Sequence, residues 1–167
     1  KKFLLSFENK EYENVNNEPY RRVWTKSITS YATNYNLFDI SLAPLKESTF
    51  NKVKSQLKVI EAGFHKKALI AQDFGPYQID VVNAYEKGGN LNEEANGFLV
   101  PTSKNHKFWY SHLKKLILNP ELITKLGENL YKTVNGTYDM KSVCENRKEL
   151  YKKLISEKKV KEVDLVK

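Results

Sequence analysis

The sequence predicts an α/β fold: a doubly wound parallel sheet between two layers of helices (α/β/α), followed by C-terminal helices. Short apolar runs alternate with helical patterns through the first two thirds of the chain, and three helical patterns follow one another in the last third. Strands that alternate with helices favour a parallel sheet covered on both faces. The length suits a single domain over residues 1–167, which can bury roughly 70% of its unfolded surface.

The first third of the chain predicts two strands, a short helix and a third strand. Residues 3–7 are an apolar run bounded by polar residues, which is typical of a short buried strand. Residues 22–28 alternate and contain β-branched and aromatic side chains, so they predict a second strand. A short helix is expected over residues 30–36. Residues 39–45 indicate a strand that is interrupted by Pro44.

The middle third predicts one long helix between buried strands. At about 100° per residue, a helix over residues 51–64 places four apolar side chains on one core stripe: Val53, Leu57, Ile60 and Phe64. Residues 68–71 and 97–101 are short apolar strands. Residues 73–77 form a loop because Gly and Pro interrupt regular structure. A short helix is expected over residues 80–85.

Three helices close the chain. The first covers residues 105–118, and Asn119-Pro120 gives the second helix a cap and a proline at its first position. Asn135-Gly136 ends the second helix because both residues tolerate a positive φ. Asp139 can cap the third helix, and residues 156–167 are expected to form a frayed tail.

Composition and charge exclude several classes of protein. Hydrophobic residues make up 40% of the chain and charged residues 29%, a balance that excludes a disordered or low-complexity protein. The single cysteine, Cys144, excludes an internal disulfide framework. Apolar runs are too short to span a bilayer and no signal peptide opens the sequence, so we expect a cytoplasmic protein. The net charge of +8 favours an anionic partner.

The positive charge is concentrated where the fold predicts a ligand site. Residues 50–70 carry five lysines against one glutamate. The predicted helix in this segment follows a strand, so its amino end lies at the ligand-binding edge of the sheet. One side of that helix, about 80° wide, collects polar side chains: Asn51, Lys54, Lys58 and Glu61, with Ser55 close by. Two lysines and the N–H groups of a helix start suit a diphosphate, and the glutamate could accept ribose hydroxyls.

Each of these segments also has a purely structural interpretation. Lys58 and Glu61 form an i,i+3 pair, which equally suits a solvent-exposed amphipathic face. Gly75-Pro76-Tyr77 follows a buried strand, so its amides and the tyrosine could close over a ligand. An ordinary strand-to-helix turn has the same pattern. Neither Gly-x-Gly-x-x-Gly after the first strand nor a P-loop motif occurs in the sequence.

An ordered set of segments resembles the carboxyl-terminal half of retaining glycosyltransferases with the GT-B architecture. The most similar group is family 4, the "group 1" transferases of bacterial polysaccharide synthesis. The segments that carry the resemblance are residues 39–45, 50–55, 57–63, 68–77 and 96–100, the last resembling the family's N-G-x-L-V strand, together with the Asn-Pro-x-Leu-x-x-x-Leu-Gly helix that starts at Asn119. The resemblance extends over about residues 37–155 and implies a Rossmann-like domain that binds a nucleotide-sugar.

The resemblance also implies roles for particular residues. Glu61 matches the second glutamate of the family's E-x7-E motif, which usually contacts the donor ribose. The first glutamate falls at Val53, so its usual role has no candidate here. The stretch that approaches the diphosphate and sugar corresponds to Asn51, Lys54, Ser55 and Lys58. The family's glycine-containing loop corresponds to Gly75, Pro76 and Tyr77.

The implied reaction is a metal-independent, retaining transfer of a hexose from a nucleotide-sugar to a saccharide or lipid-linked acceptor. In this architecture fixed cations and helix N–H groups stabilise the leaving diphosphate. The sequence has no D-x-D motif and its three histidines lack a matched ligand set, so we expect no metal and no cofactor. No catalytic residue is assigned. The family's acceptor-binding amino-terminal domain is absent, so we expect the isolated chain to transfer sugar poorly or not at all.

Other functions remain open on the sequence. Basic charge and many aromatic residues permit a nucleic-acid-binding module, although no RRM, KH or helix-turn-helix signature occurs and no nucleic acid is expected. A non-catalytic scaffold or regulatory α/β module is the other alternative, because Val53 departs from the family motif and Asp73 is well placed at a strand end. The basic last helix also permits peripheral contact with the inner face of the plasma membrane.

Overall fold

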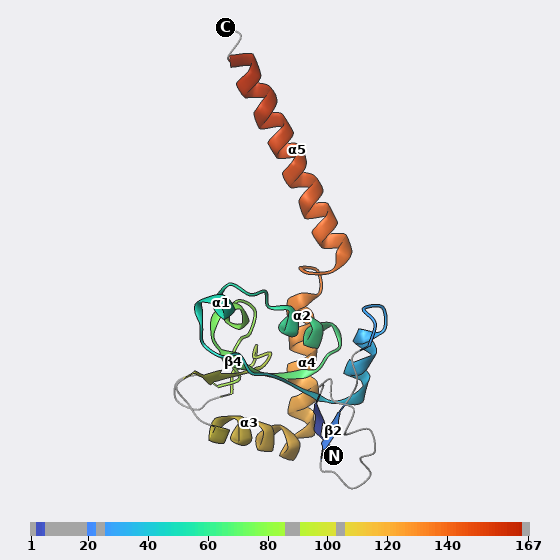
Figure 1. Cartoon of the computed structure of the whole chain (residues 1–167), viewed down its shortest axis with the longest axis vertical. Coiled ribbons are helices and arrows are strands. Elements are labelled where there is room, and N and C mark those ends of the chain that lie inside the picture. The colour runs from blue at the N-terminus through green and yellow to red at the C-terminus, as the bar shows by residue number, and fades with distance from the viewer. Residues whose placement is uncertain (1–2, 6–19, 23–25, 86–90, 103–105, 165–167) are drawn as a thin grey trace.

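A computed structural model describes residues 3–5, 20–22, 26–85, 91–102 and 106–164 of the chain. Figure 1 shows a body of short strands and helices, from which one long helix, α5 (Met140–Asp164), leads away. The sheet of the body is seen nearly edge-on in that view, with α2 (Leu57–Phe64) above it and α3 (His106–Leu118) below it. The carboxyl end of α5 therefore lies far from the sheet.

Three parallel strands form the sheet of the body. They are β3 (Ile40–Ala43), β4 (Ala68–Asp73) and β5 (Phe98–Pro101), in the order β3-β4-β5. The central strand β4 is buried along almost its whole length, as an apolar strand covered on both faces must be. A separate parallel pair joins β1 (Phe3–Leu5) to β2 (Tyr20–Arg22). The predicted α/β class with a parallel sheet is confirmed.

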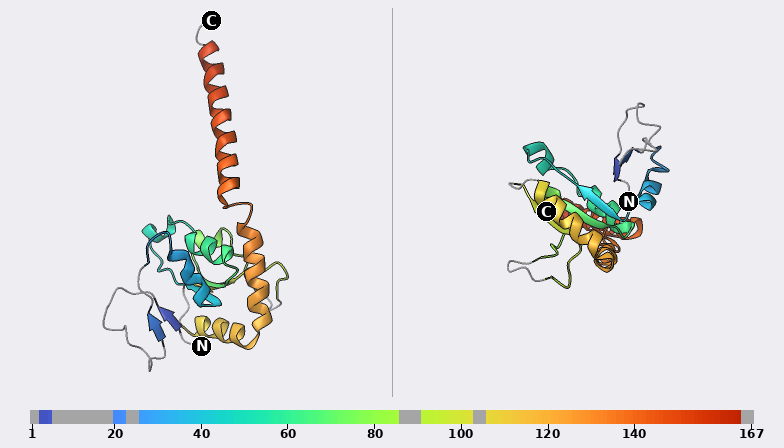
Figure 2. Two further views of the ribbon diagram at one scale, coloured as in Figure 1. Left: turned by 90° about the vertical axis from the view of Figure 1, so that its right-hand side faces the viewer. Right: turned by 90° about the horizontal axis from the view of Figure 1, so that it is seen from below.

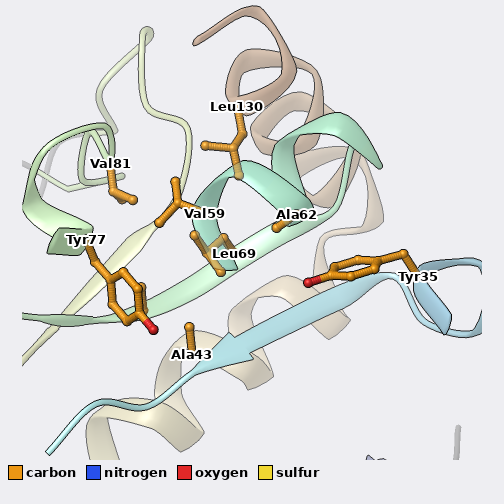
Figure 3. Close-up of a cluster of buried hydrophobic side chains, with 9 residues drawn as sticks. Tyr35, Ala43, Val59, Ala62, Leu69, Tyr77, Val81 and Leu130 are labelled. Carbon is orange, nitrogen blue, oxygen red and sulfur yellow. The ribbon is translucent and has the colours of Figure 1, made fainter. Parts of the chain in front are cut away.

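Alternate residues of β4 enter two separate hydrophobic clusters. Leu69 and Ala71 pack with Val59 and Ala62 of α2 (Leu57–Phe64), and Figure 3 shows this cluster over one face of the sheet. On the other face, Ala68 and Ile70 join a second cluster. It is completed by residues from β5, from the chain before β5, from α3 (His106–Leu118) and from α4 (Pro120–Val134): Phe98, Val100, Ala84, Ala95, Leu116, Leu122 and Leu126. Helices therefore cover both faces, which confirms the three-layer arrangement.

Helix α4 (Pro120–Val134) contributes to both clusters. Leu130 packs on the side of α2, whereas Leu122 and Leu126 pack on the side of α3. Small residues allow the close approach. A Cβ added at Gly127 would lie 2.2 Å from the carbonyl oxygen of Lys66, in the turn between α2 and β4. This helix thus fixes the turn that leads into the central strand.

Helix α5 (Met140–Asp164) begins at a side-chain cap and leaves the body. The Asp139 carboxylate accepts hydrogen bonds from the N–H groups of Ser142 and Gly136, each at 3.0 Å. Figure 2 shows the helix standing clear of the body in a second view. Its backbone is helical as far as Asp164, where the sequence predicts a frayed tail from residue 156. Residues 165–167 of that predicted tail lie outside the described residues.

No helix in the described part of the chain combines the length and the apolar character needed to cross a membrane.

The predicted helix over residues 51–64 is wrong as a single element. The chain forms α1 (Thr49–Lys52), then an irregular segment over 53–56, then α2. The Ser48 hydroxyl accepts a hydrogen bond from the Asn51 N–H at 3.2 Å and starts α1 early. The predicted core stripe fails with it: Val53 is 79% exposed, and the residues that α2 buries are Val59, Ala62 and Gly63.

Two other predicted elements differ from the structure. β2 lies at Tyr20–Arg22, residues 26–27 are irregular and residues 28–30 form a turn, so the predicted strand over 22–28 is displaced. Parts of three predicted elements lie outside the described residues: residues 23–25 of that strand, residues 6–7 of the first predicted strand, and residue 105 of the predicted helix 105–118.

The predicted helix over residues 80–85 is also wrong. The Asn96 side chain donates to the Asp80 carbonyl at 2.8 Å and accepts from the Val82 N–H at 2.7 Å. These long-range bonds take the place of a helical ladder, which a local pattern cannot reveal. Within the described ranges, 3₁₀ helices occur at the expected short helix, η2 (Tyr31–Leu37), and from within the predicted loop, η3 (Gly75–Gln78).

Candidate functional site

A cavity of about 410 Å³ lies at the carboxyl end of β3. Its walls come from the end of that strand, the irregular segment over 53–56, the start of α2, and η3. The lining residues are Leu42, Ala43, Pro44, Leu45, Lys54, Ser55, Leu57, Lys58 and Tyr77. This is the edge of a parallel sheet where ligands bind in doubly wound folds. The walls are mainly apolar, and the cationic groups are two lysines.

Lys58 is held in a defined position at the cavity. Its Nζ donates to the Tyr31 hydroxyl at 2.6 Å and to Oε2 of Glu61 at 2.9 Å. Burial lowers the pKa of Lys58, but the hydrogen bonds to Tyr31 and Glu61 and the attraction of Glu61 together outweigh it. The net pKa is therefore raised above 10.5, and the side chain is an ammonium group at neutral pH.

Glu61 lies behind Lys58 and outside the lining of the cavity. Its side chain is 19% exposed, and Oε2 also accepts a hydrogen bond of 2.7 Å from the hydroxyl of Tyr35. The pKa of Tyr35 is raised well above its usual value, first by burial and then by this hydrogen bond to the carboxylate. Both hydrogen bonds use Oε2, so among the described residues Oε1 is left for a further donor.

Lys54 and Ser55 reach the cavity from the irregular segment, not from a helix face as predicted. Both residues are exposed. The Nζ of Lys54 lies 5.0 Å from the centroid of the Phe50 ring, a cation–π contact at an exposed site. The two lysines thus approach the same space from two segments: Lys54 is an exposed surface cation, and Lys58 is held by hydrogen bonds.

Asn51 is not among the lining residues. Its side-chain amide donates to the Lys46 carbonyl at 2.7 Å and its backbone N–H is bound by Ser48. The structure therefore places Asn51 within α1, where its side chain binds the loop that follows β3. This contradicts the expectation that Asn51 shares a helix face with the lysines, because the helix assumed for that geometry is broken.

The Gly75-Pro76-Tyr77 segment contributes one side chain to the cavity. Tyr77 lines it and is buried, and burial raises the pKa of the phenol, against an opposing effect of Lys58. Pro76 is buried, and Gly75 has a φ of 59°. A Cβ at Gly75 would lie 3.2 Å from the Cα of Lys52, so these two residues serve to pack η3 against α1.

Three polar residues near the cavity were not predicted. Tyr31 and Tyr35 come from η2 and bind the Lys58–Glu61 pair across 27 and 26 residues of sequence. Gln56, at the start of α2, donates to the Tyr138 hydroxyl, which in turn donates to the Asp80 carboxylate at 2.9 Å. The i,i+4 spacing of the two tyrosines in a predicted helix indicated that they share one face of it. No local pattern could identify the partner of Gln56, which lies 82 residues away in the sequence.

The arrangement suits an anionic ligand that has an apolar part. An ammonium with two of its three donors engaged keeps the third for a phosphoryl oxygen. The first turn of an eight-residue helix adds N–H groups without intrahelical partners. Among the residues that the structure describes, no three His, Cys, Asp or Glu side chains gather as a metal site would require.

No family model matches the sequence, and no curated protein matches it either. Solved structures do match. A sucrose-phosphate synthase from Thermosynechococcus elongatus has a TM-score of 0.59 at 18% identity, over 81% of this chain and 31% of that one. The C-terminal domain of a group 1 family glycosyl transferase from Francisella tularensis has a TM-score of 0.50 at 25% identity, over 72% of this chain and 55% of that one.

These likenesses show the fold of the chain. It is that of the carboxyl-terminal domain of GT-B glycosyltransferases, as the sequence resemblance implies. The chain spans about a third of the synthase and just over half of the second matching chain.

Proposed function

We propose that this chain is the donor-binding domain of a glycosyltransferase and that the cavity holds the diphosphate of a nucleotide-sugar. The observation that carries the proposal is the pair of lysines, Lys54 and Lys58, on one cavity at the carboxyl end of β3. Ligands bind at this edge in doubly wound folds. The solved structures with this fold include a glycosyl transferase domain, which supports a nucleotide-sugar as the ligand.

The division of roles follows from the geometry. Lys58 is anchored and half-buried, so its charge acts on a phosphoryl oxygen without being reordered. Lys54 is exposed and adds long-range attraction. Glu61 offers Oε1 to a ribose hydroxyl, and Tyr77 supplies an apolar wall. Fixed cations and helix N–H groups would stabilise the leaving diphosphate with no metal ion, in a retaining transfer of a hexose.

The complete enzyme needs a second half. We propose an amino-terminal domain that binds a saccharide or lipid-linked acceptor, in a bacterial pathway of polysaccharide synthesis. Such acceptors would place the enzyme in the cytoplasm, in peripheral contact with the inner face of the plasma membrane. Residues 1–167 alone would bind the donor weakly and transfer sugar poorly or not at all, because the acceptor would be held by the other domain.

Calorimetric titration with UDP, GDP and ADP tests the proposal. We expect one of the three to bind, and Lys58→Ala to weaken that binding by about 1–2 kcal/mol, the scale of a charge-assisted contact. Lys54→Ala should weaken it less, because its side chain is exposed. Lys114→Ala on α3 is the matched control, since it removes an exposed lysine elsewhere.

Two outcomes would contradict the proposal. One is unchanged affinity in Lys54→Ala, Lys58→Ala and Glu61→Ala. The other is the absence of nucleotide binding together with a steeply salt-dependent affinity for oligonucleotides, which would favour a nucleic-acid-binding module.

A further inference from the structure

The 3₁₀ helix η2 presents two tyrosine hydroxyls to the ion pair at the candidate site. The Tyr31 hydroxyl receives the Lys58 ammonium at 2.6 Å, and the Lys58 Nζ also lies 5.1 Å from the centroid of the Tyr31 ring. The Tyr35 hydroxyl donates to Glu61 at 2.7 Å. Each charged group therefore has one tyrosine partner from the same short helix.

Tyr31 and Glu61 together fix the orientation of the ammonium. An ammonium group has three N–H donors, and these two partners occupy two of them. Because Lys58 lines the cavity, the third donor is the one left for a ligand. Without Tyr31, only Glu61 would hold the ammonium at the end of a flexible side chain. The ligand would then have to immobilise that side chain on binding, which lowers the affinity.

Tyr35 fixes the carboxylate in the same manner. Its ring is buried and stacks on His65 at 4.8 Å and tilts against Phe38 at 5.2 Å, so the hydroxyl has a defined position. A tyrosine hydroxyl has a single proton, and here it is donated to Oε2 of Glu61. This bond and the one from Lys58 both use Oε2, so among the described residues Oε1 is the carboxylate oxygen left to accept from a ligand hydroxyl.

We propose that Tyr31 and Tyr35 are positioning residues of the donor site, Tyr31 for the phosphate-binding ammonium of Lys58 and Tyr35 for the ribose-binding carboxylate of Glu61. This inference rests on the proposed nucleotide-sugar site and deepens it. It assigns η2, an element outside the segments that resemble the glycosyltransferase family, to ligand recognition. The tyrosines act through their partners and make no contact with the ligand themselves.

Double-mutant cycles in the full chain separate positioning from general structural support. The probes are pyrophosphate, UDP, GDP and ADP, titrated by calorimetry. Tyr31→Phe should weaken pyrophosphate binding about fivefold, the loss that one hydrogen bond ordinarily carries, and should have no further effect in a Lys58→Ala background. Tyr35→Phe should weaken the nucleoside diphosphate that binds, leave pyrophosphate unchanged, and have no further effect in a Glu61→Ala background.

A matched control and a folding check accompany the cycles. Tyr131→Phe removes a hydroxyl from another tyrosine with a lysine over its ring, Lys66 at 4.9 Å, and should change no affinity. Melting temperatures identify any variant that fails to fold. Tyr31 is only half-buried, so the Tyr31 cycle stands even if the buried Tyr35 variant is unstable.

The outcomes distinguish this inference from the proposed function. If the wild type binds none of the four probes, both are overturned. If it binds and the tyrosine effects add to those of Lys58→Ala and Glu61→Ala, or if both tyrosine variants bind as the wild type does, the donor site stands and the positioning role is overturned.

Discussion

Gly127 gives a prediction in which two physical effects have opposite signs. The residue lies inside α4, where replacing glycine with alanine ordinarily stabilises a helix by about 1 kcal/mol. In this chain the added Cβ would lie 2.2 Å from the carbonyl oxygen of Lys66 and 2.7 Å from its carbonyl carbon. The helix and the turn before β4 would both have to move.

The size of the effect follows from what surrounds the contact. An ordinary contact begins at 3.4 Å, so the two segments must separate by about 1.2 Å. The clashing atoms are backbone, and Lys66 has a φ of 52°, so the turn has little freedom to adjust. Leu126 and Leu130 on either side of Gly127 are fully buried and would lose contacts. Overpacking costs about 1–3 kcal/mol or more, and we expect a net destabilisation of about 2 kcal/mol after the helix-propensity gain.

Thermal unfolding followed by circular dichroism at 222 nm measures this directly. A loss of about 2 kcal/mol lowers the melting temperature of a chain of this size by roughly 4–8 °C. Thr124→Ala is the control, since it changes an exposed position in the same helix and should leave the melting temperature unchanged or slightly higher. An unchanged or raised melting temperature in Gly127→Ala would refute the packing of α4 on the turn.

Three further predictions concern the site and α5. Folding raises the pKa of Lys58, so its ammonium stabilises the fold below pH 10.5, and this contribution is lost as the pH rises through the raised pKa. The urea midpoints of the wild type and Lys58→Met should therefore converge in that pH range, and a constant difference would contradict the prediction. Gly75→Ala and Gly136→Ala share the conformational penalty of a positive φ, about 1–2 kcal/mol. The added Cβ at Gly75 also meets the backbone of Lys52, so this variant should have the lower urea midpoint, and equal midpoints would exclude the contact between η3 and α1. The pKa of Asp139 is lowered, first by its side-chain hydrogen bond with Ser142, so the cap is present above pH 3.8 and lost as the pH falls through the lowered pKa. At neutral pH, Asp139→Ala should speed amide hydrogen exchange at Ser142 but not in β4, and an unchanged exchange rate at Ser142 would show that Asp139 does not cap α5.

Strands β3, β4 and β5 and the second C-terminal helix were predictable because their signals are local. β3, β4 and β5 are apolar runs with breakers beside them, and α4 begins at the Asn119-Pro120 cap that the sequence displays. Each of these elements buries side chains that its own pattern identifies. The fold class follows from their order, because the parallel connections leave few alternatives.

The candidate site was only partly predictable, because its geometry depends on a break in a helix. Periodicity favours a continuous helix over residues 51–64. In the structure Ser48 caps the separate helix α1, and the Gln56 side chain donates to Tyr138, which lies 82 residues later in the sequence. The lysines still reach one cavity, although Lys54 comes from the irregular segment. Tyr31 and Tyr35 act over long sequence separations, which local spacing does not encode.

The length of α5 has a mechanical consequence. Its 25 residues extend about 36 Å from a base that Asp139 caps. A rod of that length magnifies rotation: a swing of about 10° at the base displaces the tip by about 6 Å. Tyr138, one residue before Asp139, accepts a hydrogen bond through its hydroxyl from the side chain of Gln56. A small rotation at the base is therefore a large displacement at the far end of the helix.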